Sequence, residues 1–252
     1  MTDNSVIKTK DAAPRIWQID ALRGVAIILM TVFHALVDIR DFFGFADVRY
    51  FEPPLVYIGK ASAILFIFIS GVSCRFSKSN IKRGVKVLLC GLIVTAATYF
   101  YVPELYIRFG ILHFLGTAMI LTGVLQMLIR NEKVMQPFLW VAAPLSLLMG
   151  RFFSTVHTQL PFLLVIGIIT PEFRSYDYYP LFPWMGVFFA GYAAGRFVLR
   201  NRDKITSFHM ARVLSPLCGL GKISLIYYLL HQPALIAVFY AVDMFFRKPL
   251  NM

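Results

Sequence analysis

Seven long apolar segments dominate this sequence. They lie at residues 21–39, 55–74, 86–102, 109–129, 136–150, 180–199 and 221–243. A helix needs roughly 20 residues to cross a bilayer core about 30 Å thick, and a helix satisfies its backbone polar groups internally, as lipid requires. The pattern therefore predicts an all-α integral membrane protein, a bundle of about seven transmembrane helices in contact with membrane lipids.

The composition agrees with this prediction. Hydrophobic residues make up 58% of the chain and charged residues only 15%, whereas about one quarter of a soluble domain is charged. The apolar stretch 160–169 is interpreted as a re-entrant or interfacial part of an outer loop, and an eighth span is the alternative. Because no internal repeat or low-complexity linker is evident, we predict a single domain over residues 1–252.

The distribution of Lys and Arg indicates the orientation in the membrane. With the N-terminus inside, seven spans place 17 of the 25 basic residues on the cytoplasmic side, but only 5 of the 13 acidic ones. Basic residues favour cytoplasmic loops, so we predict the N-terminus in and the C-terminus out, with the first apolar segment kept as an anchor. The net charge of +12 lies between apolar spans and on no single amphipathic face, which argues against nucleic acid as a partner.

Two ionisable residues lie within the first apolar segment, where such groups are costly and usually functional. Arg23 and His34 are separated by ten uncharged residues, which places them roughly 16 Å apart along a helix. Arg23 suits a phosphate or pyrophosphate group. Asp38 follows His34 by four residues, so it shares a helix face and can orient the imidazole as a general base. The alternatives are a hydrogen-bonded core histidine and an arginine that reaches the interface beside Asp20.

Two further histidines, His113 and His231, lie within predicted spans. Helix rise places both in the middle or outer half of the bilayer. His231 precedes Gln232 and Pro233, and polar side chains beside a proline in a helix often line a cavity. A structural role for each histidine is the alternative. No CxxC or Cys/His spacing indicates a metal site.

Two groups of loop residues complete the candidate site. Arg83 and Lys86 lie in a basic segment that would recruit an anionic co-substrate from the cytosol, although orientation in the membrane also explains such charges. Asp177 and Trp184 lie in an aromatic-rich outer segment. We interpret it as the rim of an outer site, with Asp177 facing a polar acceptor and aromatic rings stacking on a sugar. An interfacial aromatic belt is the alternative.

Four motifs in order resemble bacterial members of the heparan-alpha-glucosaminide N-acetyltransferase catalytic-domain family, within the transmembrane acyltransferases. They are IDALRGVAIILMTVFH, FGILHFLG, DYYPLFPWMGVFFAGYAAG and SLIYYLLHQP. The resemblance covers residues 15–235 and implies an acyl-CoA donor from the cytosol and a sugar acceptor on the outer face. It also implies a location in the bacterial inner (cytoplasmic) membrane.

The resemblance carries over residue by residue. Arg23 matches the family arginine and His34 the histidine of the bacterial pattern, whereas the lysosomal branch has Asn at that spacing and its histidine further along. Because this chain has no histidine between His34 and His113, the departure supports His34 as the base and leaves heparan-type specificity open. The other matches are Asp20 and Gly24 in the first motif, His113 in the second and His231 in the last.

These patterns predict a membrane acyltransferase that moves an acetyl group from acetyl-CoA to an amine or hydroxyl of a glycan or amino sugar. Direct transfer and an acetyl-histidine intermediate both fit. The alternative function is a proton-coupled transporter or flippase that uses the same histidines. A homodimer is one option for the assembly. The predicted residues are His34, Asp38 and His231 for catalysis, Arg23, Arg83, Lys86 and His113 for the donor, and Asp177 and Trp184 for the acceptor.

Overall fold

The computed structural model of the chain describes residues 15–43, 47–207 and 212–246. Within these ranges every regular element is a helix, and only two isolated β-bridges occur. The predicted all-α fold is confirmed. Both chain ends lie outside the described residues, as do six charges used in the orientation prediction: Asp3, Lys8, Lys10, Asp11, Arg247 and Lys248.

Seven helices in the described part of the chain have 18 or more residues, and each overlaps one predicted apolar segment. They are α1 (Trp17–Phe43), α2 (Leu55–Cys74), α3 (Asn80–Tyr101), α4 (Ile111–Leu128), α5 (Glu132–Phe153), α6 (Leu181–Arg200) and α9 (Ser224–Phe246). The shorter elements are η1 (Pro161–Val165), α7 (Arg202–Thr206), η2 (Arg212–Leu214) and α8 (Ser215–Lys222). Five of the long helices, α1 to α4 and α9, are long and apolar enough to cross a membrane. The count of seven spans stays a prediction.

Two predicted segments differ in the structure. The fifth one, 136–150, extends to the full length of α5 because Asn131 caps the helix by accepting a hydrogen bond from the backbone N–H of Lys133, and the helix continues through Pro144. The stretch 160–169 contains only the five-residue 3₁₀ helix η1. That element is too short to cross a bilayer, so this stretch provides no eighth span.

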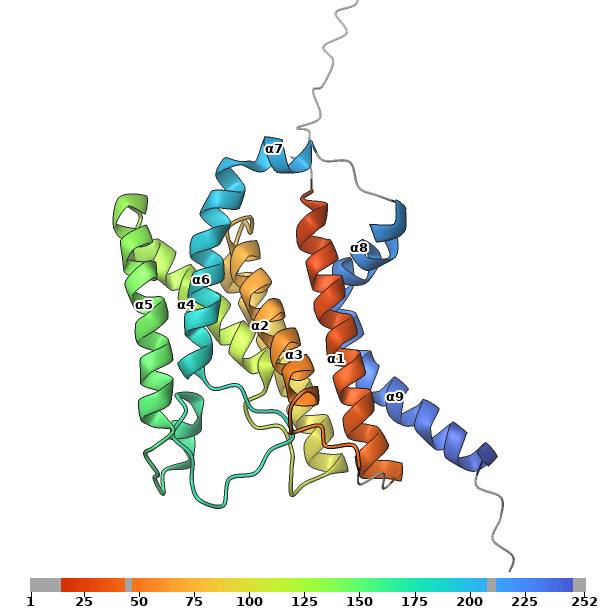
Figure 1. The fold of residues 1–252 in the computed structure, drawn as a ribbon. Coiled ribbons are helices and arrows are strands. Elements are labelled where there is room, and N and C mark those ends of the chain that lie inside the picture. Colours follow the sequence, from red (N-terminus) through yellow and green to blue (C-terminus); the bar gives the residue numbers. More distant parts are fainter. Residues whose placement is uncertain (1–14, 44–46, 208–211, 247–252) are drawn as a thin grey trace, which may run out of the picture.

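The long helices form a bundle whose members run roughly along one axis (Figure 1). Helices α1 to α6 stand beside one another, whereas α9 slants away from α1 toward its own C-terminal end. The short helices α7 and α8 lie at the opposite end, near the start of α1. The first half of α9 therefore remains beside α1, so the first and last helices of the described chain are in contact.

Small residues let neighbouring helices approach closely, as is common inside membranes. Helices α2 and α6 cross at Gly71 and Gly191. A Cβ atom on Gly71 would lie 2.3 Å from the carbonyl oxygen of Phe188, and one on Gly191 would lie 2.1 Å from that of Phe68. The side chains of Phe114 and Phe188, both fully buried, meet edge to face with ring centroids 6.4 Å apart. The centre of the bundle is therefore fixed by backbone contact as well as by packing.

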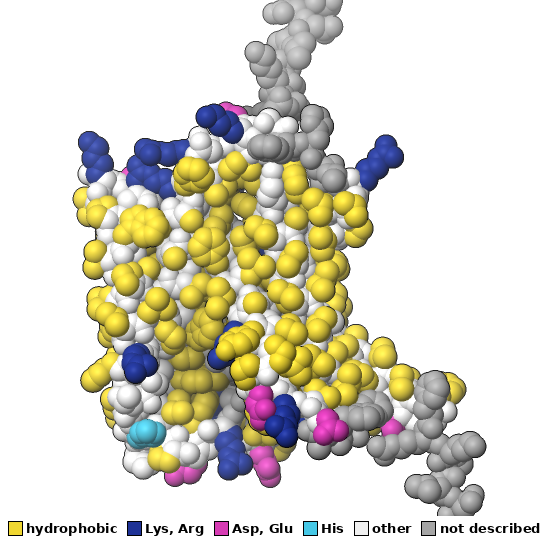
Figure 2. Space-filling model, in the orientation of Figure 1, with side chains coloured by type: hydrophobic (Ala, Val, Ile, Leu, Met, Phe, Trp, Pro, Cys, Tyr) yellow, Lys and Arg dark blue, Asp and Glu magenta, His cyan; other side chains and the backbone are white. Residues whose placement is uncertain are grey.

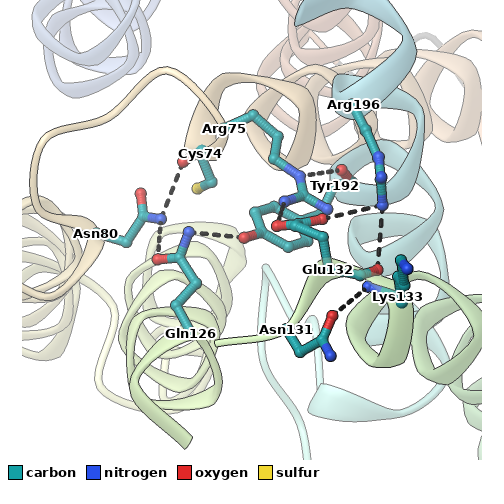
Figure 3. Close-up of polar contacts among 9 residues, drawn as sticks. All are labelled: Cys74, Arg75, Asn80, Gln126, Asn131, Glu132, Lys133, Tyr192 and Arg196. Atoms are coloured by element: carbon teal, nitrogen blue, oxygen red, sulfur yellow. Dashed lines mark hydrogen bonds and ion pairs between the residues drawn. The ribbon is translucent and has the colours of Figure 1, made fainter. Parts of the chain in front are cut away.

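A polar network joins α2, α3, α4, α5 and α6 at one end of the bundle (Figure 3). Its centre is Arg75, which donates to Glu132 at 2.7 Å and lies over the ring of Tyr192, with its guanidinium carbon 3.9 Å from the ring centroid. The hydroxyl of Tyr192 accepts a hydrogen bond from Gln126 at 2.6 Å, and Gln126 in turn accepts one from Asn80 at 3.0 Å. These bonds hold together the neighbouring ends of these five helices.

The molecular surface is apolar between two polar ends (Figure 2). Large hydrophobic side chains such as Ile93, Phe100 and Leu148 are exposed on the sides of the bundle. Lys and Arg side chains gather at the end that carries α7, whereas the opposite end carries both signs of charge (Figure 2). A wide apolar belt of this kind is what a lipid environment requires.

Candidate functional site

A cavity of about 530 Å³ opens beside the start of α1 and is called here the arginine cavity. Its charged lining residues are Arg15, Asp20, Arg23, Arg83 and Arg202, from α1 and its preceding residues, α3 and α7. Guanidinium groups bind phosphate oxygens in a planar, bidentate geometry. Four of them line this one cavity, which gives it a strongly cationic wall.

Asp20 fixes two of these arginines. This carboxylate is 2% exposed and accepts hydrogen bonds from Arg15 at 2.6 and 3.1 Å and from Arg23 at 3.1 Å. Arg23 also donates to the hydroxyl of Ser73, which itself donates to the carbonyl oxygen of Ile69 at 2.7 Å. A buried carboxylate is stabilised when it is paired in this way. The sequence placed Asp20 beside Arg23, and the structure adds the contact with Ser73 on α2.

A second cavity of about 160 Å³, the inner cavity, shares Arg23 and Arg83 with the first. Lys86 also lines it, so the structure brings together three of the residues predicted to bind the donor. The remaining walls are mostly apolar, from α2, α3, α4 and α9: Phe66, Val87, Leu112, Leu115, Met119 and Leu225. Tyr228 on α9 lines the same cavity. A narrow apolar passage next to a cationic cavity suits a ligand with a charged head and a thin, less polar arm.

His34 and His231 meet between α1 and α9. Their ring centroids are 5.0 Å apart. The Nδ1 atom of His34 lies 3.0 Å from the carbonyl oxygen of Met30, and that of His231 lies 2.6 Å from the carbonyl oxygen of Tyr228. Because a carbonyl oxygen only accepts, each Nδ1 carries the proton. Each neutral imidazole therefore presents the lone pair of its Nε2, as a general base requires.

The predicted contact between Asp38 and His34 is wrong. Asp38 is 3% exposed, and its Oδ1 accepts a hydrogen bond from Nε2 of Gln232 at 2.8 Å. The partner of the His34 Nδ1–H is the carbonyl oxygen of Met30 within its own helix. An i,i+4 spacing permits a contact along a helix. Here the Nδ1–H of His34 is already donated to Met30, so the imidazole has no N–H left for Asp38. The side-chain amide of Gln232 on α9 is the donor instead.

Near the histidine pair, three buried acceptor atoms have no hydrogen-bond partner within the described residues. They are Asp38 Oδ2, Gln232 Oε1 and His231 Nε2. Gln232 uses its amide nitrogen on Asp38, which fixes its oxygen as the remaining acceptor. Buried polar groups are nearly always satisfied in native proteins, so each of these acceptors can take a hydrogen bond from water or from a ligand. We call Asp38, Gln232 and His231 the acceptor cluster.

Asp177 lies in the loop before α6 and points into the protein. Its Oδ2 accepts hydrogen bonds from the backbone N–H of Ile111 at 2.9 Å and from the hydroxyl of Tyr228 at 3.4 Å. Burial raises the pKa of the Asp177 carboxyl to about 6, an effect that these two hydrogen bonds oppose. The carboxylate thus sits at the N-terminus of α4, where the helix dipole favours negative charge. A Cβ atom on Gly110 would lie 2.3 Å from it, which explains the glycine of the FGILH motif.

The structure gives His113 and Trp184 local contacts. Nδ1 of His113 accepts the backbone N–H of Gly110, and its Nε2 lies 3.1 Å from the hydroxyl oxygen of Thr95. His113 is not among the residues that line either cavity described here. Trp184 packs against Tyr179 with ring centroids 4.9 Å apart. These contacts account for both side chains as parts of the fold, and their predicted roles in binding stay predictions.

The sequence pointed to Gln232 only as a polar neighbour of His231 and Pro233, and it did not single out Tyr228 or Arg202. Tyr228 lies in the motif around His231, within a helical turn of it, and that spacing was the available signal. Arg202 in α7 belongs to a basic segment whose charges, in the sequence alone, indicate only the orientation of the protein in the membrane. Within residues 15–43, 47–207 and 212–246, no three His, Cys, Asp or Glu side chains come together as a metal site would need.

Comparison with known proteins adds one finding. The family model described as heparan-alpha-glucosaminide N-acetyltransferase, catalytic, matches residues 15–233. The matched range includes both cavities, both histidines and the acceptor cluster. Neither the curated proteins nor the solved structures contain a match.

Proposed function

Because the chain belongs to the heparan-alpha-glucosaminide N-acetyltransferase catalytic family, a family of membrane acetyltransferases, we propose that it transfers an acetyl group from acetyl-CoA to the amine of an amino sugar. The donor enters from the cytosolic end and the acceptor from the outer end, in the bacterial inner membrane. The observation that carries the proposal is the pair His34 and His231, each with its Nδ1–H bound to a backbone carbonyl, about three helical turns along α1 from Arg23 in the arginine cavity.

Two neighbouring cavities that share Arg23 and Arg83 support this donor. The arginine cavity would hold the phosphates of CoA through Arg23, Arg83 and Arg202. The pantetheine arm would run through the inner cavity, whose walls are largely apolar. The 11 residues from Arg23 to His34 correspond to roughly 16 Å of helix, which an extended pantetheine arm spans. The thioester would then reach the histidine pair while the phosphates stay at the mouth.

The acceptor cluster favours an amine over a hydroxyl. A protonated amine carries three N–H donors and one positive charge, which match the carboxylate oxygen of Asp38, the amide oxygen of Gln232 and the Nε2 of His231. A hydroxyl offers one O–H donor and would leave buried acceptors unfilled, which is costly. One of the two imidazoles then removes a proton so that the amine can attack the thioester.

Purified protein in detergent tests the proposal directly. Incubation with acetyl-CoA and D-glucosamine should release CoA thiol and form an N-acetyl product that mass spectrometry detects. D-glucose, which has a hydroxyl in place of that amine, should react far more slowly. A protein that releases no thiol with any amino sugar, while it binds acetyl-CoA and remains folded, would contradict the proposed activity.

A proton-coupled transporter or flippase is the second candidate, because the two intramembrane histidines could also carry protons. Proteoliposomes distinguish the two functions. Uptake of labelled amino sugar that follows a pH gradient, with no acetylated product, would favour transport. Formation of product that depends on acetyl-CoA and occurs without a pH gradient would favour the acetyltransferase.

A further inference from the structure

Tyr228 connects the inner cavity to the histidine pair. Its side chain lines that cavity together with Arg23, Arg83 and Lys86. Its backbone carbonyl accepts the Nδ1–H of His231 at 2.6 Å, and the two rings lie 5.4 Å apart. The residue that orients the imidazole therefore also places a phenol where the donor's arm would end.

The position of Tyr228 along the cavity follows from its neighbours. Its hydroxyl shares the carboxylate of Asp177 with the backbone N–H of Ile111, the first residue of α4. The phenol therefore lies beside the start of α4, whereas Arg23 lies where the inner cavity adjoins the arginine cavity.

The hydrogen bond from Tyr228 to Asp177 is long. The two oxygens are 3.4 Å apart, whereas hydroxyl–carboxylate bonds are normally 2.5 to 2.7 Å. Asp177 keeps a shorter bond, 2.9 Å, from Ile111, so it retains a partner when the phenol turns away. The hydroxyl proton can therefore be redirected to a ligand at small cost.

We propose that the Tyr228 hydroxyl is a catalytic residue, the hydrogen-bond donor to the carbonyl oxygen of the donor thioester. This inference rests on the proposed acetyl transfer and adds a residue that neither the motifs nor the family match assigns. Donors placed where negative charge develops are often the largest single contribution to catalysis of acyl transfer.

The reaction balances with this assignment. The amine nitrogen forms a bond to the thioester carbon, the carbonyl π pair moves to oxygen, and Tyr228 donates its O–H to that oxygen without losing the proton. Collapse reforms the carbonyl and breaks the carbon–sulfur bond, and the electron pair leaves with sulfur. The ammonium gives up two protons in all. One is released to water before the attack, and the second, which an imidazole Nε2 takes from the nitrogen as the new bond forms, passes to the CoA thiolate. No oxidant, reductant or metal is needed.

Tyr228→Phe removes one oxygen atom and tests the role. Tyr227→Phe is the matched control, because the neighbouring hydroxyl bonds instead to Thr31 at 2.9 Å and ties α9 to α1. With acetyl-CoA and D-glucosamine, we expect kcat of Tyr228→Phe to fall about 100-fold or more. The KM for acetyl-CoA and the Tm should stay near those of the wild type, and Tyr227→Phe should lose less than about threefold in kcat.

Each outcome decides the inference. If the wild type is active and Tyr228→Phe is equally active, the role of Tyr228 is overturned and the proposed function stays in place. A Tyr228→Phe variant that keeps kcat and instead binds acetyl-CoA weakly would also overturn it, because the hydroxyl would then bind the ground state. An inactive wild-type protein would overturn the proposed function and this inference together.

Discussion

The imidazoles of His34 and His231 lie against each other, with ring centroids 5.0 Å apart and planes at 63°. They come from helices separated by almost the whole chain, and in each ring Nδ1–H is bound to a backbone carbonyl. Two bases with the same tautomer therefore face one small region. One accepts the proton of the acceptor while the other remains neutral beside it, since two adjacent imidazolium ions would repel each other.

Replacing either histidine should abolish transfer without unfolding the protein. We expect His34→Gln and His231→Gln to lower kcat by about 100-fold or more, the usual contribution of a general base. Thiol release measures the rate, and a thermal melt in detergent checks the fold. His157→Gln, at an exposed loop position, is the control and should keep normal turnover. A pair of active histidine variants would exclude both residues as the base.

Asp38→Asn should weaken binding of the acceptor but not that of the donor. The substitution removes a buried negative charge from the acceptor cluster while it keeps an oxygen for Gln232. A hydrogen bond to a charged group contributes about 1.5–3 kcal/mol, so the KM for D-glucosamine should rise about 10- to 100-fold. The KM for acetyl-CoA should be unchanged. Asp41→Asn, an exposed carboxylate one turn further along α1, is the matched control. An equal effect on both substrates would argue that Asp38 only supports the fold.

Arg83→Gln should weaken binding of the donor but not that of the acceptor, the reverse of Asp38→Asn. Arg83 lines both cavities, so its loss should raise the KM for acetyl-CoA about 10-fold, as expected for one charge-assisted bond to phosphate. The KM for the amino sugar should not change. The control is Arg49→Gln, because Arg49 is exposed and pairs with the exposed Glu52 at 3.4 Å, away from both cavities. If Arg83→Gln binds acetyl-CoA as tightly as the wild type does, Arg83 is not part of the donor site.

Asp177 should make stability depend on pH with a definite sign. Burial raises its pKa to about 6 in the folded protein, above the ordinary value of about 4 for an aspartate in an unfolded chain. Between about pH 6 and pH 4 the folded state takes up a proton that the unfolded state does not. The contribution of Asp177 to the free energy of unfolding therefore increases as pH falls through this window, and is lost as pH rises above 6.

Asp177→Asn isolates this effect, because an amide oxygen can still accept the N–H of Ile111. Between pH 7.5 and pH 4.5, the wild type should gain about 1–3 kcal/mol relative to the variant. Thermal melts of both proteins across this range measure the difference. Parallel pH profiles for the two proteins would contradict the raised pKa.

The sequence predicts the helices of this protein better than it predicts their contacts. Apolar length alone located the seven long helices, because lipid leaves few alternatives to a helix. Arg23 and His34 lie on one helix, so their separation followed from helix rise. The contact of His34 with His231, and that of Asp38 with Gln232, join residues nearly 200 positions apart. Such pairs depend on how α9 packs on α1, which no local pattern encodes.

The inward orientation of the Asp177 side chain was also not predictable from the local sequence. Its position in an outer loop suggested a carboxylate facing an acceptor. The free backbone N–H at the start of α4 instead draws it inward, because a helix N-terminus needs acceptors. The signal was present in the glycine of FGILH, but its meaning requires the tertiary contact between Gly110 and Asp177.

Two glycines in α8 should respond in opposite ways to a methyl group. A Cβ atom on Gly221 would lie 1.9 Å from the carbonyl oxygen of Asp20, whereas one on Gly219 would meet nothing within 4 Å. Gly221→Ala must push α8 away from α1, which should destabilise the protein by about 1–3 kcal/mol. Gly219→Ala should stabilise it by about 0.4–1 kcal/mol, because alanine restricts the unfolded chain.

The same pair of variants tests whether α8 supports the donor site. Asp20 holds Arg15 and Arg23 in the arginine cavity, so displacement of its backbone should weaken acetyl-CoA binding in Gly221→Ala. Gly219→Ala should bind acetyl-CoA as the wild type does. Thermal melts and acetyl-CoA titrations on the two variants measure both effects. Should Gly221→Ala lose stability but bind acetyl-CoA normally, the arginine cavity would be independent of the α1–α8 contact, and Asp20 would hold its arginines through α1 alone.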